Sequence, residues 1–76
     1  MDELPDDVRY LEVGGTTFCV IWEELGVGSS FFLPTTATVA QVKSALRPGA
    51  KYFNVELDAS PRVERGLYGI RVWRLA

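Results

Sequence analysis

The clearest pattern in the chain is an alternation of apolar and polar residues from Phe53 to Glu64. Successive side chains of a strand point to opposite faces of a sheet, so a period of two over these residues predicts one long, half-buried strand. Pro61 within the run indicates an edge position or a bulge, because proline cannot donate a ladder hydrogen bond.

Arg65 and Gly66 predict a two-residue turn, after which residues 67–76 return as a second strand. The turn fixes the register of such a hairpin. The predicted partners are Glu64 with Leu67, Val63 with Tyr68, Pro61 with Ile70, Ala59 with Val72 and Leu57 with Arg74. This register places Arg71 and Trp73 on the polar face of the hairpin and not in the core.

The first half of the chain predicts another hairpin. Residues 8–13 and 16–22 are rich in aromatic and branched side chains, and Gly14 with Gly15 between them suits the positive φ of a tight turn. After a turn over residues 23–29, the run SFFLP predicts a short strand that ends at its proline.

The sequence predicts one helix, which begins after Thr38. This residue can cap the first turn, and three apolar residues then recur on one face. They are Val39, Val42 and Leu46. Pro48 and Gly49 indicate the end of the helix, although a further turn through residues 50–52 is compatible with a proline at the first position of a helical turn.

Together these elements predict an α+β fold: a small antiparallel sheet of four to five strands with one helix packed on one face. The helix is expected to pack on the sheet through Val39, Val42 and Leu46. Much of the core should come from residues of the predicted strands, which are Phe18, Val20, Phe32, Phe53, Val55, Leu57, Ile70 and Val72.

The 76 residues leave no room for a second domain. Residues 1–7 hold four acids and no apolar period, so we expect an acidic flexible tail followed by a single domain over residues 8–76. A chain this short has a stability of a few kcal/mol. A homodimer would add buried surface, and the sequence leaves the oligomeric state open.

Charge is unevenly distributed along the chain. Residues 1–24 hold seven acids and one arginine, whereas residues 25–76 hold seven basic residues and three acids. Such an asymmetry is typical of an interaction face or a tail, and the alternative is that the two halves neutralise each other within the fold.

The residue types argue against catalysis and metal binding. The chain has no histidine, which is the usual general base and the commonest metal ligand, and its single cysteine, Cys19, cannot form a zinc site alone. The adjacent acids Glu23 and Glu24 are typical of a solvated surface. We therefore expect no enzyme activity, no cofactor and no metal.

Several features predict a cytoplasmic location without membrane association. No apolar run approaches the ~20 residues that a membrane helix needs. The N-terminus is acidic, where a secretory signal would be basic and then apolar. One unpaired cysteine also fits a reducing compartment.

The candidate binding surface is basic and aromatic. It comprises Arg62, Arg65, Tyr68, Arg71, Trp73 and Arg74. Arginines and planar side chains are common at the centres of protein interfaces, and they also bind single-stranded nucleic acid. In the alternative interpretation, the N-terminal hairpin covers Trp73 and the arginines pair with Glu56, Asp58 and Glu64.

Two short motifs resemble a group of small uncharacterised proteins from tailed bacteriophages and prophages. The shared SFFxP and GxRVWR patterns correspond here to Ser30, Phe31, Phe32, Pro34, Gly69, Arg71, Val72, Trp73 and Arg74. The resemblance implies a phage accessory protein in the cytosol of a host bacterium. On this basis we expect a noncatalytic protein that binds a host protein through the Arg/Trp face and the acidic N-terminus, with single-stranded nucleic acid as the alternative partner.

Overall fold

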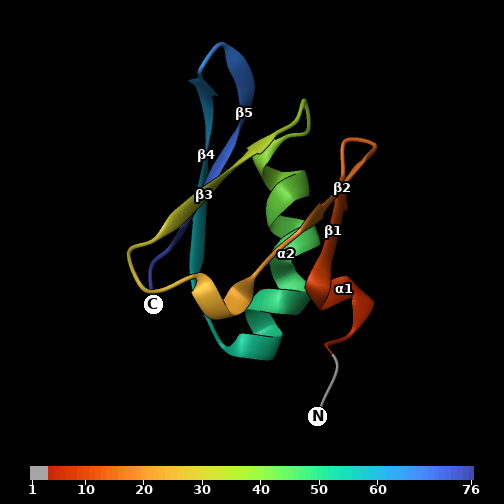
Figure 1. Ribbon diagram of the computed structural model, residues 1–76, viewed down its shortest axis with the longest axis vertical. Coiled ribbons are helices and arrows are strands. Elements are labelled where there is room, and N and C mark those ends of the chain that lie inside the picture. The colour runs from red at the N-terminus through yellow and green to blue at the C-terminus, as the bar shows by residue number, and fades with distance from the viewer. Residues whose placement is uncertain (1–3) are drawn as a thin grey trace.

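Two antiparallel sheets and one long helix form the fold in the computed structural model, which describes residues 4–76 (Figure 1). The elements in chain order are α1 (Asp6–Arg9), β1 (Tyr10–Val13), β2 (Thr16–Cys19), the short 3₁₀ helix η1 (Trp22–Glu24), β3 (Ser30–Pro34), α2 (Val39–Phe53), β4 (Leu57–Glu64) and β5 (Leu67–Arg74). The α+β class is confirmed.

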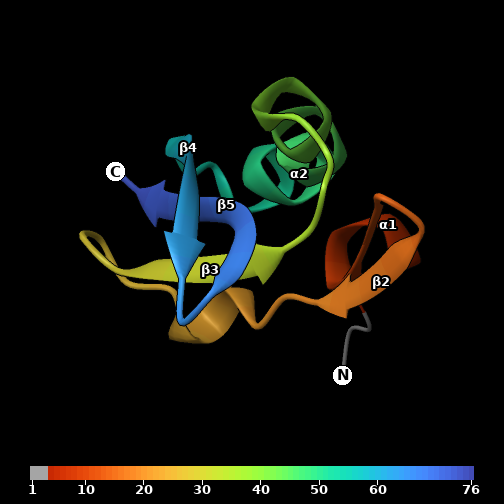
Figure 2. The same ribbon diagram turned by 90° about the horizontal axis from the view of Figure 1, so that it is seen from above.

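The strands within the described residues are divided between two sheets. β1 and β2 form a two-stranded sheet, and the other strands form a three-stranded sheet in the order β3-β5-β4. The prediction of a single sheet of four to five strands is therefore wrong. Helix α2 packs against β1 of one sheet and against β4 of the other, and β2 does not pair with β3 (Figures 1 and 2).

Both predicted hairpin turns are confirmed. Gly14 and Gly15 have φ values of 60° and 78°, and Arg65 and Gly66 have φ values of 53° and 77°. Since positive φ at both central residues matches the twist of a two-residue hairpin, each turn sets the register of its strands. All the predicted partners of β4 and β5 are found, from Glu64 opposite Leu67 to Leu57 opposite Arg74.

The strands are shorter than the apolar patterns predicted. β4 begins at Leu57, whereas Phe53 is the last residue of α2 and Asn54 caps the helix in the left-handed conformation. The alternation from Phe53 continues across this boundary because the helix end and the strand both send apolar side chains to the core. Similarly, Trp22 belongs to η1 and not to the hairpin strand.

The start of α2 is confirmed. An end of the helix at Pro48 and Gly49 is wrong, and the alternative of a further turn through residues 50–52 is confirmed. Thr38 accepts a hydrogen bond from the Gln41 amide, and the Gln41 side chain accepts one from the Thr38 amide, which completes a capping box. The helix then continues through Pro48 to Phe53. Gly49 is buried inside α2, and its lack of a side chain lets the helix pack closely against the Trp22 ring.

The core lies on both sides of α2. Val20, Ile70 and Val72 are buried as predicted. Phe18, Phe53, Val55 and Leu57 are half-buried against this core. Most of the buried side chains were not on the predicted list; they are Val8, Leu11, Val13, Trp22, Leu25, Leu33 and Ala37, with Val42 and Leu46 from the predicted helix face.

The assignment of Phe32 to the core is wrong. In the β3–β5 ladder, Phe31 and Leu33 lie opposite Val72 and Ile70 and share their face, whereas Phe32 lies opposite Arg71 on the other face. Two adjacent phenylalanines in a strand must point in opposite directions, and pairing with β5 decides which one faces α2.

The expected acidic tail contains a short helix. Asp6 and Asp7 form the first turn of α1, Val8 is buried, and Leu4 packs against the core. Residues 1–3 lie outside the described residues, so the flexibility of residues 1–7 stays a prediction. Within residues 4–76, no helix combines the length and the apolar character that crossing a bilayer requires.

Replacement of Gly49 by alanine should destabilise the fold. A Cβ atom there would overlap Cζ2 and Cε2 of Trp22. Alanine gains ~1 kcal/mol over glycine in a helix, while overpacking a core costs ~1–3 kcal/mol. We expect a net loss of up to ~2 kcal/mol in the free energy of unfolding, measured by urea denaturation.

Gly26→Ala is the control, because its added Cβ would meet nothing closer than Ser29 Oγ at 3.6 Å. This change should stay within ~0.5 kcal/mol of the parent chain. Equal or higher stability of Gly49→Ala would contradict the role assigned to the contact with Trp22.

Candidate functional site

The six candidate binding residues do not form one patch. Arg62, Arg71 and Trp73 lie at register positions on the sheet face opposite α2. Tyr68 and Arg74 alternate onto the face of Val72, which lies beside α2, and Arg65 occupies the β4–β5 turn. We use the term open face for the side that carries Arg62, Arg71 and Trp73.

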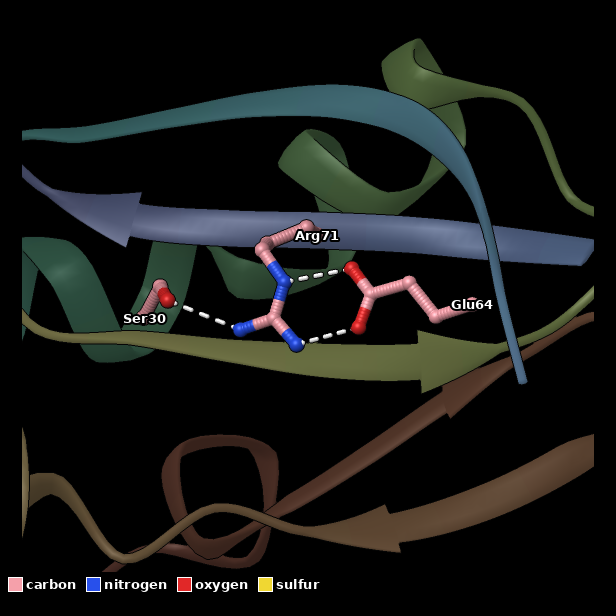
Figure 3. Close-up of polar contacts among 3 residues, drawn as sticks. All are labelled: Ser30, Glu64 and Arg71. Atoms are coloured by element: carbon pink, nitrogen blue, oxygen red, sulfur yellow. Dashed lines mark hydrogen bonds and ion pairs between the residues drawn. The ribbon is translucent and has the colours of Figure 1, made fainter.

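Arg71 connects all three strands of its sheet. Its Nε and Nη2 atoms donate to the two carboxylate oxygens of Glu64 at 2.6 and 2.5 Å. Nη1 donates to Ser30 Oγ at 2.8 Å, so the guanidinium lies between β4 and β3 (Figure 3). All three nitrogens of the guanidinium are hydrogen-bonded, and Arg71 therefore acts as a cross-strand clamp and not as a free anion-binding group.

Phe32 supports this clamp from β3. The Arg71 guanidinium carbon lies 5.8 Å from the centre of the Phe32 ring. A Cβ atom at Gly69 would overlap Phe32 Cζ and the Leu33 carbonyl, so the absence of a side chain at Gly69 makes space for the ring. Gly69 in the sequence motif therefore has a packing role on the open face.

The Arg71–Glu64 pair is ionised over a wide pH range. Hydrogen bonding with Arg71 is the main cause that lowers the pKa of Glu64 below its ordinary value. The charges of Arg71, Arg62 and Arg65 also lower this pKa, whereas partial burial raises it. The hydrogen bond with Glu64 in turn raises the pKa of Arg71. Both side chains are half-buried, with 27% and 31% of their surfaces exposed for Arg71 and Glu64 respectively.

Arg74 is also engaged within the chain. Its Nη1 donates to the Leu25 carbonyl at 2.7 Å, and its Nε donates to the Ala76 carbonyl at 3.2 Å. Of the acids proposed as arginine partners, Glu64 pairs with Arg71, while Asp58 lies 3.7 Å from Lys43 in an exposed pair.

Trp73 and Arg62 remain available on the open face. Trp73 is half-buried, and the guanidinium carbon of Arg62 lies 5.2 Å above the centre of its ring. Arg62 itself is exposed. A cation–π contact at such an exposed position contributes ~0.5–1 kcal/mol, so a partner could displace Arg62 at little cost.

A groove of about 480 Å³ lies beyond the free edge of β3. It is lined on the β3 side by Ser29, Ser30, Phe31, Phe32 and Leu33, and on the other side by Phe18, Cys19, Val20, Ile21, Glu24 and Leu25. The sequence analysis missed this groove. The apolar runs on either side of the turn were visible, but nothing local indicated that β2 and β3 would lie across a groove and not in one sheet.

No protein-family model matches the chain, and comparisons with curated proteins and with solved structures find no significant match. Within residues 4–76, no three Asp, Glu or Cys side chains gather as a metal site would require. The function therefore has to be inferred from the surface of the chain itself.

The stabilising effect of the Arg71–Glu64 pair should depend on pH. Because the pKa of Glu64 is lower in the folded than in the unfolded chain, the pair stabilises the fold above the ordinary value of 4.5, and this stabilisation is lost as the pH falls through the lowered pKa. Glu64→Gln should therefore unfold at less urea than the parent chain at pH 7, and the difference should shrink below about pH 4.

The control is Glu12→Gln, on the exposed side of β1. Its urea midpoint should stay close to that of the parent chain at both pH values. A Glu64→Gln difference that is the same at pH 7 and pH 3 would show that the charge of Glu64 contributes nothing.

Proposed function

We propose that the chain is a small noncatalytic accessory protein that binds another protein through its open face. Trp73 is the central contact residue, with Arg62 beside it. The phage resemblance of the SFFxP and GxRVWR motifs makes a bacterial host protein the expected partner, in the host cytosol. Binding would modulate or inhibit that partner.

The observation that carries this proposal is the position of Trp73. Trp73 lies on the sheet face that α2 leaves uncovered and is half-buried. The exposed Arg62 side chain lies over its ring. Leu67 on the same face is 56% exposed. Tryptophan and arginine are the residues most enriched at the energetic centres of protein interfaces.

The Arg71 clamp supports binding indirectly. It holds β3, β5 and the end of β4 together beneath the open face. A rigid surface loses less conformational entropy when a partner binds, so a clamp of this kind favours affinity. Arg71 is thus a positioning residue in this proposal.

The acidic N-terminal region would supply a second contact. Five of its acids within the described residues are exposed: Asp6, Asp7, Glu12, Glu23 and Glu24. Complementary charge speeds association and selects partners with a basic surface. The host protein is therefore expected to carry basic residues near its contact with this region.

Single-stranded nucleic acid is the second candidate partner. Arg62, which lies over Trp73, and Arg65, in the β4–β5 turn, are both exposed. The two guanidinium groups could contact phosphates, and the Trp73 ring could stack on a base. Two observations favour a protein partner: Arg71 and Arg74 hydrogen-bond within the chain, and the sequence pI is about 4.9.

The test is affinity capture from bacterial lysate, with and without nuclease, using the tagged chain and its Trp73→Ala variant. Truncation of an interface tryptophan costs ≥ ~2 kcal/mol, so the affinity for the partner should fall by at least about 30-fold for Trp73→Ala, with a clear loss of the protein retained after nuclease treatment. Tyr52→Ala, an exposed aromatic residue on α2, should capture as much as the parent chain.

Unchanged capture by Trp73→Ala would reject the open face as the contact surface. Loss of every partner on nuclease treatment would favour the nucleic-acid candidate, and capture of nothing by the parent chain would reject protein binding in this lysate. Circular dichroism of each variant confirms that the fold is retained.

A further inference from the structure

Two free strand edges face the groove. β3 is at one edge of the three-stranded sheet, and β2 is at an edge of the two-stranded sheet. Four consecutive residues of each region, 30–33 and 18–21, line the same groove. Figure 3 shows the free edge of β3 turned toward the N-terminal segments and away from β5.

The backbone of β3 presents hydrogen-bonding groups at its free edge. The Arg74 amide donates to the Ser29 carbonyl, so in an antiparallel ladder Phe31 and Leu33 bond to β5. Ser30 and Phe32 alternate with them and direct their N–H and C=O groups outward. On β2, the Val20 amide donates to the Arg9 carbonyl, and by the same alternation Cys19 directs its backbone groups away from β1. Beyond β2, the Ile21 carbonyl accepts a hydrogen bond from the Glu24 amide.

The edge of β3 lacks the features that usually prevent strand addition. β4, at the other edge of the sheet, carries Pro61 together with Asp58, Arg62 and Glu64. The residues of β3 include no charge, and its proline is only at the end. Natural proteins protect exposed edges with charges and prolines, so an uncharged edge is typical of a strand that another chain covers.

We propose that the groove binds an extended segment of the partner protein, which adds a strand to β3. This inference rests on the proposed function, because the partner supplies the segment. Backbone hydrogen bonds to Ser30 and Phe32 would give the affinity, and alternate apolar side chains would enter the groove.

The lining specifies the chemistry of this segment. Most of the lining side chains are apolar, and Glu24 is the one charged residue among them. The ion pairs within residues 4–76 do not include Glu24. The segment should therefore combine alternating apolar residues with a lysine or arginine placed to meet Glu24.

The shape of the groove favours a single segment over a second copy of this chain. A second β3 would bring its own β5 along its far side, where β2 and η1 already form the opposite wall through Val20, Ile21 and Leu25. A segment without neighbouring strands meets no such obstacle. The volume of about 480 Å³ is within the usual range of ligand pockets, ~300–1,000 Å³.

The groove is continuous with the open face. Ser30 pairs with Trp73 and Phe32 pairs with Arg71 across the β3–β5 ladder. A strand added to β3 would therefore be separated from β5, which carries Trp73, by β3 alone. The same partner could place an extended segment in the groove and another surface on Trp73.

The test selects binding peptides from a random library of about eight residues, a length that covers a typical strand, against the whole chain. Selected peptides should share alternating apolar residues and a lysine or arginine. Bound peptide should slow hydrogen exchange at the Ser30 and Phe32 amides. It should also slow alkylation of Cys19, an exposed thiol in the lining.

Two controls separate strand addition from unspecific apolar binding. A selected peptide is made in two forms, with N-methyl groups on one or on the other alternate set of backbone nitrogens. Only the form that is methylated on the nitrogens that donate to β3 should lose binding. Glu24→Gln should weaken binding by about threefold to fivefold, as expected for an exposed ion pair. The matched variant Glu23→Gln, on the same turn of η1 but outside the lining, should bind as the parent chain does.

Selection of no peptide, or of peptides that leave Cys19 alkylation and both amides unchanged, would overturn the proposal. Binding that tolerates both N-methyl patterns would also overturn it. These outcomes are distinct from failure of the proposed function: lysate capture that depends on Trp73 can persist without strand addition, and peptide selection can succeed when the lysate supplies no partner.

Discussion

The packing of Trp22 joins parts of the chain that share no strand ladder. Its indole N–H donates to the Val8 carbonyl at 2.8 Å, its ring stacks on Phe53 at 5.6 Å, and its edge lies against Gly49. The N-terminal sheet and the three-stranded sheet both depend on α2 for their relative placement. A buried aromatic ring contributes a large apolar area, so this one side chain secures the hairpin, the 3₁₀ turn and the helix together.

The open face shows why counting arginines gives a poor description of a binding surface. Arg71 donates its hydrogen bonds to Glu64 and Ser30 within the sheet, whereas Arg62 lies over the Trp73 ring and is exposed. Arginine thus joins the strands of the sheet at position 71 and is available to a partner at position 62. The net charge of the region is correspondingly less informative than the hydrogen-bond partners of each guanidinium.

Local signals predicted the local structure. The Gly14–Gly15 and Arg65–Gly66 turns gave both hairpins, because a two-residue turn determines its own register. The errors occurred where distant residues decide the outcome. Helix α2 continues past Pro48 and packs Gly49 against the distant Trp22, and Phe32 faces away from α2 because β5 sets the register of β3. The clamp between Ser30 and Arg71 spans 41 positions of sequence, and no pattern along the chain could reveal it.

That separation also bears on the order in which the chain folds. The two hairpins and α2 form between residues that are close in the sequence, whereas β3 and β5 are separated in the chain by α2 and β4. Loop closure over such a distance is entropically costly, so β3 is expected to dock late in folding. The hydrogen bond from Arg71 to Ser30 therefore forms late in folding, and it then holds the docked strand β3 on the rest of the sheet.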